Sequence, residues 1–87
     1  MNHTHEFISA VSIADGKPAT YNYLSGFGCS ISEPQIGIPL LIYFDPTVVY
    51  PHTLRTSTVK ALLHEDGDVL MVTTKNSVYT IKEIDHE

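Results

Sequence analysis

Residues 58–84 read TVKALLHEDGDVLMVTTKNSVYTIKEI, and this stretch decides the fold. Two short polar runs, residues 65–68 and 75–76, divide it into three segments rich in Val, Leu, Ile and Thr. Such residues favour strands, and Asp-Gly and Lys-Asn sequences favour tight turns because Asn and Gly tolerate positive φ angles. The stretch therefore predicts three antiparallel strands, 58–64, 69–74 and 77–84, that follow one another as a meander.

Two strands are predicted upstream by alternation of apolar and polar residues. In residues 7–13, Phe7, Val11 and Ile13 share one face. An Asp-Gly turn follows, and residues 19–23 alternate again, so residues 7–23 are interpreted as a β-hairpin.

The apolar run IPLLIYF, residues 38–44, predicts another strand, with its proline at the start, where a missing N–H does least harm. Five consecutive apolar residues indicate a strand covered on both faces or one at a subunit contact. Residues 24–37 are expected to be irregular, and residues 45–55 to form a loop or a short ragged strand.

The predicted fold is all-β, with one domain over residues 1–87 in which residues 1–6 form a frayed terminus. About five or six short strands with Gly and Pro connections are typical of a small barrel-like or strongly bent antiparallel sheet. Closing the sheet would remove edges that an apolar chain exposes at risk of aggregation.

Composition excludes several classes of protein. The chain has 87 residues, 43% apolar, and a net charge of −5. Its five basic residues are scattered singly, which opposes binding to nucleic acid. No apolar run is long enough for a membrane helix, and the N-terminal residues lack the pattern of a signal peptide. The lone Cys29 cannot form an internal disulfide, so we expect a reducing, cytoplasmic location.

Two polar segments, residues 55–58 and 73–77, are dense in hydroxyl and amide groups, and each carries one cation. If they lie side by side they form a polar shelf, on which the Arg55 guanidinium can grip a phosphate or carboxylate. The predicted ligand-binding residues are Arg55, Thr56, Ser57, Thr74, Asn76, Ser77 and Tyr79. The alternative is that the threonines reflect strand propensity alone and that Arg55 packs along the sheet.

The sequence gives less support to three other candidate sites, and we predict no catalytic residue, cofactor or metal. Met1-Asn2-His3 has the spacing of an amino-terminal Cu(II) or Ni(II) site, but chain ends are usually solvated and frayed. Cys29 lies in a glycine turn with no base or cation beside it, so a buried thiol is expected. His64 and Glu65 point to opposite faces of a strand, which opposes a catalytic triad.

Four short motifs resemble parts of small β-rich proteins encoded by phages and prophages. They are Thr56-Ser57-x-Val59, Val72-x-Thr74-x-Asn76-Ser77-x-Tyr79, Gly26-Phe27-Gly28-Cys29-Ser30 and Gly37-Ile38-Pro39-Leu40, and the resemblance extends over residues 24–82. The resemblance implies a phage-type origin, and it implies that the polar shelf is the shared feature. It implies no reaction.

The leading functional hypothesis is a non-enzymatic binding protein, a phage-type accessory factor that engages a host protein and forms a homo-oligomer. Exposed aromatic residues are enriched at interfaces, as are apolar runs of this kind. The predicted interface residues are Tyr21, Tyr23, Leu40, Ile42, Phe44 and Tyr50. The alternative is a small-ligand binder that captures an anionic metabolite or nucleotide on the polar shelf.

Overall fold

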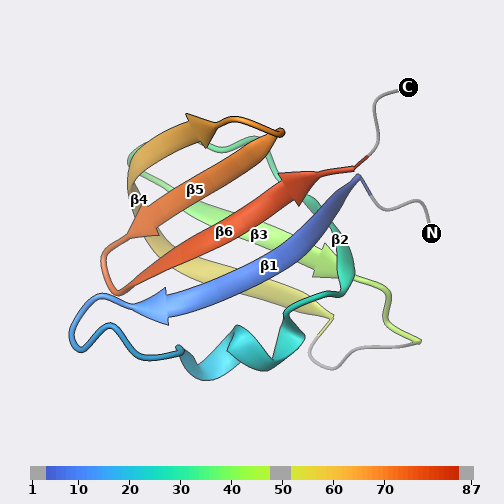
Figure 1. Ribbon diagram of the computed structural model, residues 1–87, viewed down its shortest axis with the longest axis horizontal. Helices are drawn as coiled ribbons and strands as arrows, with labels where there is room; N and C mark the ends of the chain where they lie inside the picture. The colour runs from blue at the N-terminus through green and yellow to red at the C-terminus, as the bar shows by residue number, and fades with distance from the viewer. Residues whose placement is uncertain (1–3, 48–51, 85–87) are drawn as a thin grey trace.

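The computed structural model describes residues 4–47 and 52–84. In this part of the chain, six strands form one antiparallel sheet that closes into a ring, with β6 paired to β1 (Figure 1). The strands are β1 (His5–Ser12), β2 (Gly28–Ile31), β3 (Pro39–Phe44), β4 (Thr53–Glu65), β5 (Val69–Thr74) and β6 (Ser77–Glu83), and the 3-10 helix η1 (Thr20–Leu24) follows β1. The predicted all-β class and the C-terminal meander are confirmed.

The ring encloses an apolar core to which every strand contributes. Three aromatic rings meet at its centre. Phe7 and Phe44 contact edge to face with centroids 5.8 Å apart, and Phe7 and Tyr79 lie 6.2 Å apart. Full burial of one such side chain contributes about 2–3 kcal/mol, so the aromatic group holds β1, β3 and β6 together.

Three of the six predicted interface residues lie in β3 and are buried. Leu40, Ile42 and Phe44 are 1%, 0% and 1% exposed, because alternate residues of a strand point to the same face and these three point into the ring. They cannot contact a partner unless the ring opens, so their assignment to an interface is wrong. The outer face of β3 carries Leu41 and Tyr43, of which Tyr43 is 37% exposed.

Strand β1 contains a bulge that changes its inward face. Phe7 pairs with Ile81 of β6 but Ser9 pairs with Thr80, so one extra residue lies between them on β1. An extra residue shifts the alternation, and Phe7 and Ala10 are both fully buried. The prediction that Phe7, Val11 and Ile13 share a face is therefore wrong.

Residues 19–23 do not form the second strand of a hairpin, as the sequence pattern predicted: Ala19 precedes η1, and residues 20–23 lie within it. The side chain of Asn22 accepts a hydrogen bond from the N–H of Ala10 at 2.9 Å, where a strand partner would use a backbone carbonyl. The N–H of Ala19 donates to the carbonyl of Ala10 at 2.8 Å. Asn side chains compete with regular ladders in this way. Leu24 is 1% exposed and closes the core beneath β1.

Strand β2 lies in the segment predicted to be irregular. It has four residues, of which Cys29 pairs with both His5 of β1 and Phe44 of β3. Gly26 just before the strand and Gly28 at its first position hide the strand pattern of so short a segment. The loop predicted over residues 45–55 also ends early, because β4 begins at Thr53.

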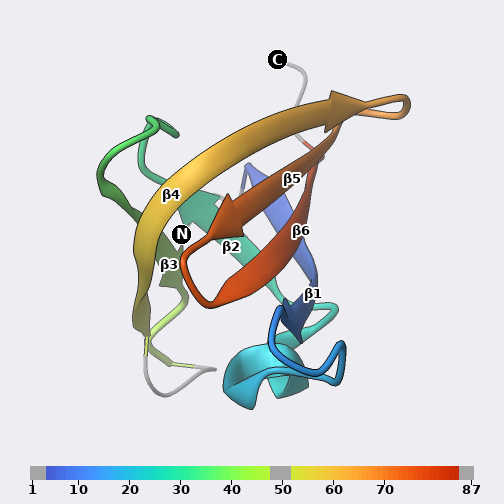
Figure 2. The same cartoon turned by 90° about the vertical axis from the view of Figure 1, so that its left-hand side faces the viewer.

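Strand β4 is thirteen residues long and bends sharply. Its first half pairs with β3 and its second half with β5. Figure 2 shows β4 as one long arc, with β5 alongside its second half only. Leu41 pairs with Arg55 and Pro39 with Thr58, so β4 has one extra residue at this point. This bulge bends the strand away from the rest of the ring.

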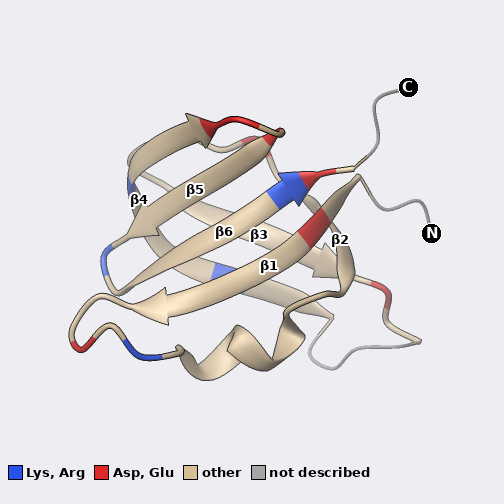
Figure 3. Ribbon diagram, in the orientation of Figure 1, with Lys and Arg blue, Asp and Glu red and all other residues tan. Residues whose placement is uncertain are grey.

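Charged residues are spread singly over the strands and loops (Figure 3). Acidic residues gather at the turn between β4 and β5, which contains Glu65, Asp66 and Asp68. In residues 4–47 and 52–84, no helix has the length and apolar character needed to cross a membrane.

A candidate binding pocket beside β4

An open pocket of about 470 Å³ lies where the first half of β4 faces the β1–η1 segment and the β5–β6 turn. We call it the Arg55 pocket. Its walls come from four parts of the chain that the ring brings together, and they are formed by Ser12, Asp15, Pro18, Ala19, Thr20, Tyr21, Arg55, Ser57, Asn76, Ser77 and Tyr79. Five of the seven predicted ligand-binding residues are among them.

The two polar segments do lie side by side. The side-chain amide of Asn76 donates a hydrogen bond to Ser57 Oγ at 2.7 Å, and the N–H of Lys75 donates to the carbonyl of Thr58 at 3.1 Å. These contacts fix the β5–β6 turn against β4. Because Ser57 Oγ accepts a hydrogen bond from Asn76, its own proton remains to be donated to a ligand.

Thr56 and Thr74 serve the fold and do not line the pocket. Thr56 is 4% exposed and points inward, where its Oγ1 accepts the N–H of Leu40 at 2.9 Å and donates to the carbonyl of Ser57 at 2.7 Å. Thr74 is 2% exposed, and its Oγ1 accepts the N–H of Ser77 at 3.1 Å and donates to the Ser77 carbonyl at 3.0 Å. The first threonine holds the β4 bulge and the second holds the β5–β6 turn.

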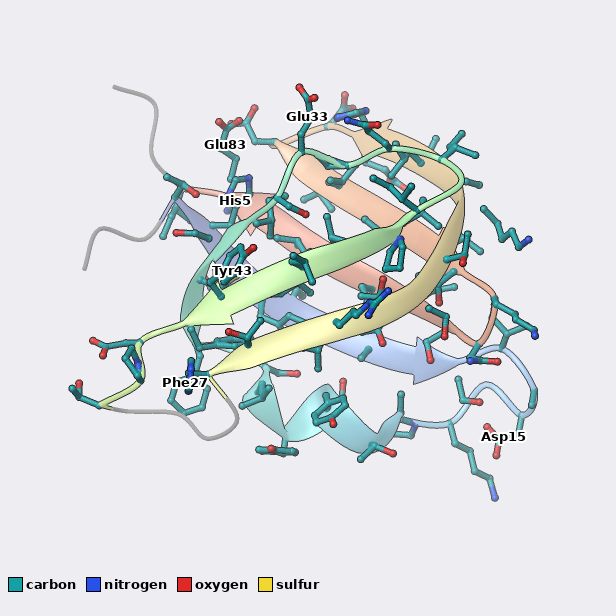
Figure 4. All side chains as sticks on the ribbon, turned by 180° about the vertical axis from the view of Figure 1, so that it is seen from behind. His5, Asp15, Phe27, Glu33, Tyr43 and Glu83 are labelled. Carbon is teal, nitrogen blue, oxygen red and sulfur yellow. The ribbon has the colours of Figure 1, made fainter. Side chains whose placement is uncertain are left out.

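One cation and one anion line the Arg55 pocket. Arg55 is exposed on β4 and makes no hydrogen bond or ion pair to another described residue. Asp15 lies in the β1–η1 loop (Figure 4), where its carboxylate accepts the N–H of Lys17 at 3.0 Å. The pocket is therefore close to electrically neutral, with the positive charge on the β4 side.

Two tyrosines, together with Pro18 and Ala19, supply the apolar part of the pocket wall. Tyr79 is 7% exposed, and burial raises its pKa, while a side-chain hydrogen bond with Ser77 opposes that effect. Tyr21 is half-buried and stacks at a tilt on Tyr23, with centroids 6.3 Å apart. Of the predicted interface tyrosines, Tyr21 thus lies in the pocket wall, Tyr23 is 59% exposed, and Tyr50 lies outside the described residues.

The sequence pattern did not identify Ser12, Asp15, Thr20 and Tyr21 as partners of Arg55 in one pocket. They lie more than thirty positions from Arg55, and a hairpin over residues 7–23 would have placed them elsewhere. The Asp-Gly turn marked the loop, but only closure of the ring brings that loop opposite β4.

A second pocket of about 300 Å³ lies at the opposite end of the ring. His5, Glu33 and Glu83 meet there (Figure 4), together with His64 and Asp68. Burial lowers the pKa of His5, and the nearby Glu83 opposes this effect. Within the described residues, no group of three or more His, Cys, Asp or Glu side chains is placed to hold a metal ion. The possible metal site at residues 1–3 lies outside them.

Cys29 faces the core and is 0% exposed. Burial, and after it the negative charge of Glu6, raises the pKa of its thiol from 9.0 to about 12. A thiol with so high a pKa is not a nucleophile near neutral pH. Its place in the structure is that of a small apolar core residue.

Comparisons with protein-family models, with curated proteins and with solved structures find no match to this chain.

Proposed function

We propose that this protein is a non-enzymatic binding protein and that the Arg55 pocket binds a ligand with one anionic group. One observation carries the proposal: the ring assembles Arg55, Ser57 and Asn76 around a pocket of about 470 Å³. That volume falls within the usual range for ligand sites, about 300–1,000 Å³. The guanidinium of Arg55 has no partner among the described residues and is available to grip a carboxylate or phosphate.

The neighbouring groups favour a ligand with a single negative charge. Ser57 can donate its hydroxyl proton, and the half-buried Tyr21 offers aromatic surface to the body of the ligand. Asp15 repels a second negative charge, and so does the net charge of −5. A carboxylate on a polar, mostly neutral body fits these walls better than a polyphosphate.

The lining residues support binding rather than catalysis. Histidine and cysteine, the usual general bases and nucleophiles, are not among the described residues that line the pocket. We also propose a cytoplasmic location and a protein as the source of the ligand, in line with the resemblance to phage-type accessory factors. Homo-oligomerisation stays a prediction, and it loses the support of the buried run in β3.

Amide chemical shifts of the labelled protein test the proposal directly. The probes are N-acetylglutamate, phosphoserine and AMP, each added as its sodium salt. We expect at least one of them to shift the amides of residues that line the Arg55 pocket, with saturation on titration. Arg55→Gln should weaken that binding about tenfold or more, since a charge-assisted hydrogen bond contributes about 1.5–3 kcal/mol.

Lys60→Gln is the matched control, because Lys60 is an exposed cation on the same strand that does not line the pocket. It removes one positive charge and should leave the affinity within about twofold of the unaltered protein. If no probe shifts the lining residues, or if the two variants weaken binding equally, the pocket is not an anion site.

A further inference from the structure

The first half of β4 has a strand partner on one side only. Residues 53–58 pair with β3, whereas pairing with β5 begins at Val59. Along residues 53–57 the other side of β4 has no strand partner among the described residues, and Arg55 and Ser57 of this stretch line the Arg55 pocket. We call residues 53–57 the free edge of β4. Within the described residues, it is one of the stretches where a strand of the ring has a strand partner on one side only.

The hydrogen bonds of the ladder show which backbone groups the free edge offers. The N–H of Phe44 donates to the carbonyl of His52 at 2.6 Å. Hydrogen-bonded pairs alternate along an antiparallel ladder, so the next such pair is Ile42 with Leu54. The backbone N–H and C=O groups of Thr53 and Arg55 therefore point away from β3.

Strand β2 provides an independent check of this alternation. The N–H of Ser32 donates to the carbonyl of Leu41 at 2.9 Å, so Leu41 and Tyr43 direct their backbone groups to β2. The residues of β3 that alternate with them therefore direct their backbone N–H and C=O groups to β4, in agreement with the β3–β4 pairing. Leu40 follows the same pattern, since its N–H bonds to Thr56 Oγ1 at the bulge.

We infer that the Arg55 pocket accepts an extended peptide segment, which pairs as an added strand with the backbone of Thr53 and Arg55. The inference rests on the proposed function and names its ligand as a peptide with an acidic residue. A residue directly opposite Arg55 in such a pair would exchange two backbone hydrogen bonds with it and place its side chain beside the guanidinium. A Glu at that position supplies the single anionic group.

A second copy of this chain fits the free edge less well than an acidic peptide. Each copy carries a net charge of −5, so two copies repel each other. A symmetric pair centred on Arg55 would also set two guanidinium groups opposite one another, and like charges in that position are destabilising. Charge complementarity thus selects a peptide with a negative residue at its centre.

The test uses the pentapeptide acetyl-Thr-Val-Glu-Val-Thr-amide and two N-methylated forms of it. Methylation of the Glu nitrogen removes the N–H that would bond to the Arg55 carbonyl. Methylation of the Val before Glu alters an N–H that points to solvent in the same strand, and so serves as the matched control. We expect the first change to weaken binding about tenfold or more and the second to weaken it less than about threefold.

Amide exchange of the protein provides the second readout. Saturating peptide should slow exchange at Arg55 about tenfold or more and leave Leu54 unchanged, because Leu54 is already bonded to Ile42. Strand addition is refuted, with the anion site intact, if the peptide binds and Arg55→Gln weakens it but the two methylated peptides bind equally. Strand addition by a peptide is also refuted if the Arg55 amide is protected from exchange without peptide and the protein sediments as a dimer, because a second copy would then occupy the free edge. Failure of the peptide and of every small anion to shift the pocket residues refutes both proposals.

Discussion

Replacing Thr56 by Val tests whether this threonine holds the β4 bulge, as the structure shows, or contacts the ligand, as the sequence suggested. The two side chains have nearly the same shape, so the change leaves no cavity. It removes the oxygen that accepts the N–H of Leu40 at 2.9 Å and donates to the Ser57 carbonyl at 2.7 Å. Leu40 is 1% exposed, so water cannot replace the lost acceptor.

The expected loss of unfolding free energy follows from that single buried donor. A buried N–H left without a partner costs about 1–3 kcal/mol. The Ser57 carbonyl lies at a half-buried residue, can turn to water, and adds little. Small domains are stable by about 5–15 kcal/mol, so Thr56→Val should lower the urea midpoint clearly without changing the slope of the transition.

Two controls separate the hydrogen bond from general effects on the strand. Thr58 lies two positions farther along the same strand, is half-buried, and makes no side-chain hydrogen bond to a described residue. Thr58→Val should therefore change the unfolding free energy by less than about 0.5 kcal/mol. Thr56→Ser keeps the hydroxyl and should retain most of the stability. The reasoning is refuted if Thr56→Val is as stable as Thr58→Val. A direct ligand contact is indicated if Thr56→Val abolishes binding while the protein stays folded.

Three further outcomes are expected. Cys29 in the native protein should react with a disulfide reagent about 100-fold or more slowly than in denaturant, because its buried thiol has a pKa of about 12, and equal rates would contradict its burial. Burial lowers the pKa of His5 in the folded protein, so the unfolded chain binds a proton at His5 first as the pH falls below 6.5. The contribution of the neutral His5 to the unfolding free energy is therefore fully present above pH 6.5 and is lost as the pH falls below it. In urea unfolding below pH 6.5, the unfolding free energy of His5→Gln should change less with pH than that of the unaltered protein, whereas the exposed control His64→Gln should not differ from it. The opposite result would contradict the role given to His5. Gly67→Ala should cost about 1–2 kcal/mol in urea unfolding because Gly67 has a φ of 79°, whereas Asp66→Ala in the same turn should cost less.

The sequence predicted the parts of the fold that depend on local pattern. Turns at residues 65–68 and 75–76 and the strands beside them follow directly from turn chemistry and strand propensity, and β3 follows from its apolar run. The bulges in β1 and β4 were not predictable in the same way. Each inserts one residue that is detected only from the register with the partner strand, β6 for β1 and β3 for β4, and each reverses which side chains face the core.

One wall of the candidate site could be predicted from the sequence, and the other could not. Arg55, Ser57 and Asn76 stood out as a polar set because two short segments rich in hydroxyl and amide groups, residues 55–58 and 73–77, carry them. The opposite wall could not be predicted, since residues 18–21 were expected to belong to a strand hairpin with β1, whereas they line the pocket and Asn22 bonds to the N–H of Ala10. Thr56 and Thr74 were mistaken for ligand contacts because sequence alone cannot distinguish an inward hydroxyl from an outward one.

The most direct measurement is amide hydrogen exchange, residue by residue, along the first half of β4 in the free protein. Leu54 and Arg55 are neighbours in one strand, but the ladder bonds Leu54 to Ile42 and leaves the Arg55 N–H facing the pocket. We predict that the Leu54 amide exchanges about 100-fold or more slowly than that of Arg55, after correction for intrinsic rates. Equal protection of the two amides would mean that the free edge of β4 is already paired, and would contradict the proposed binding site.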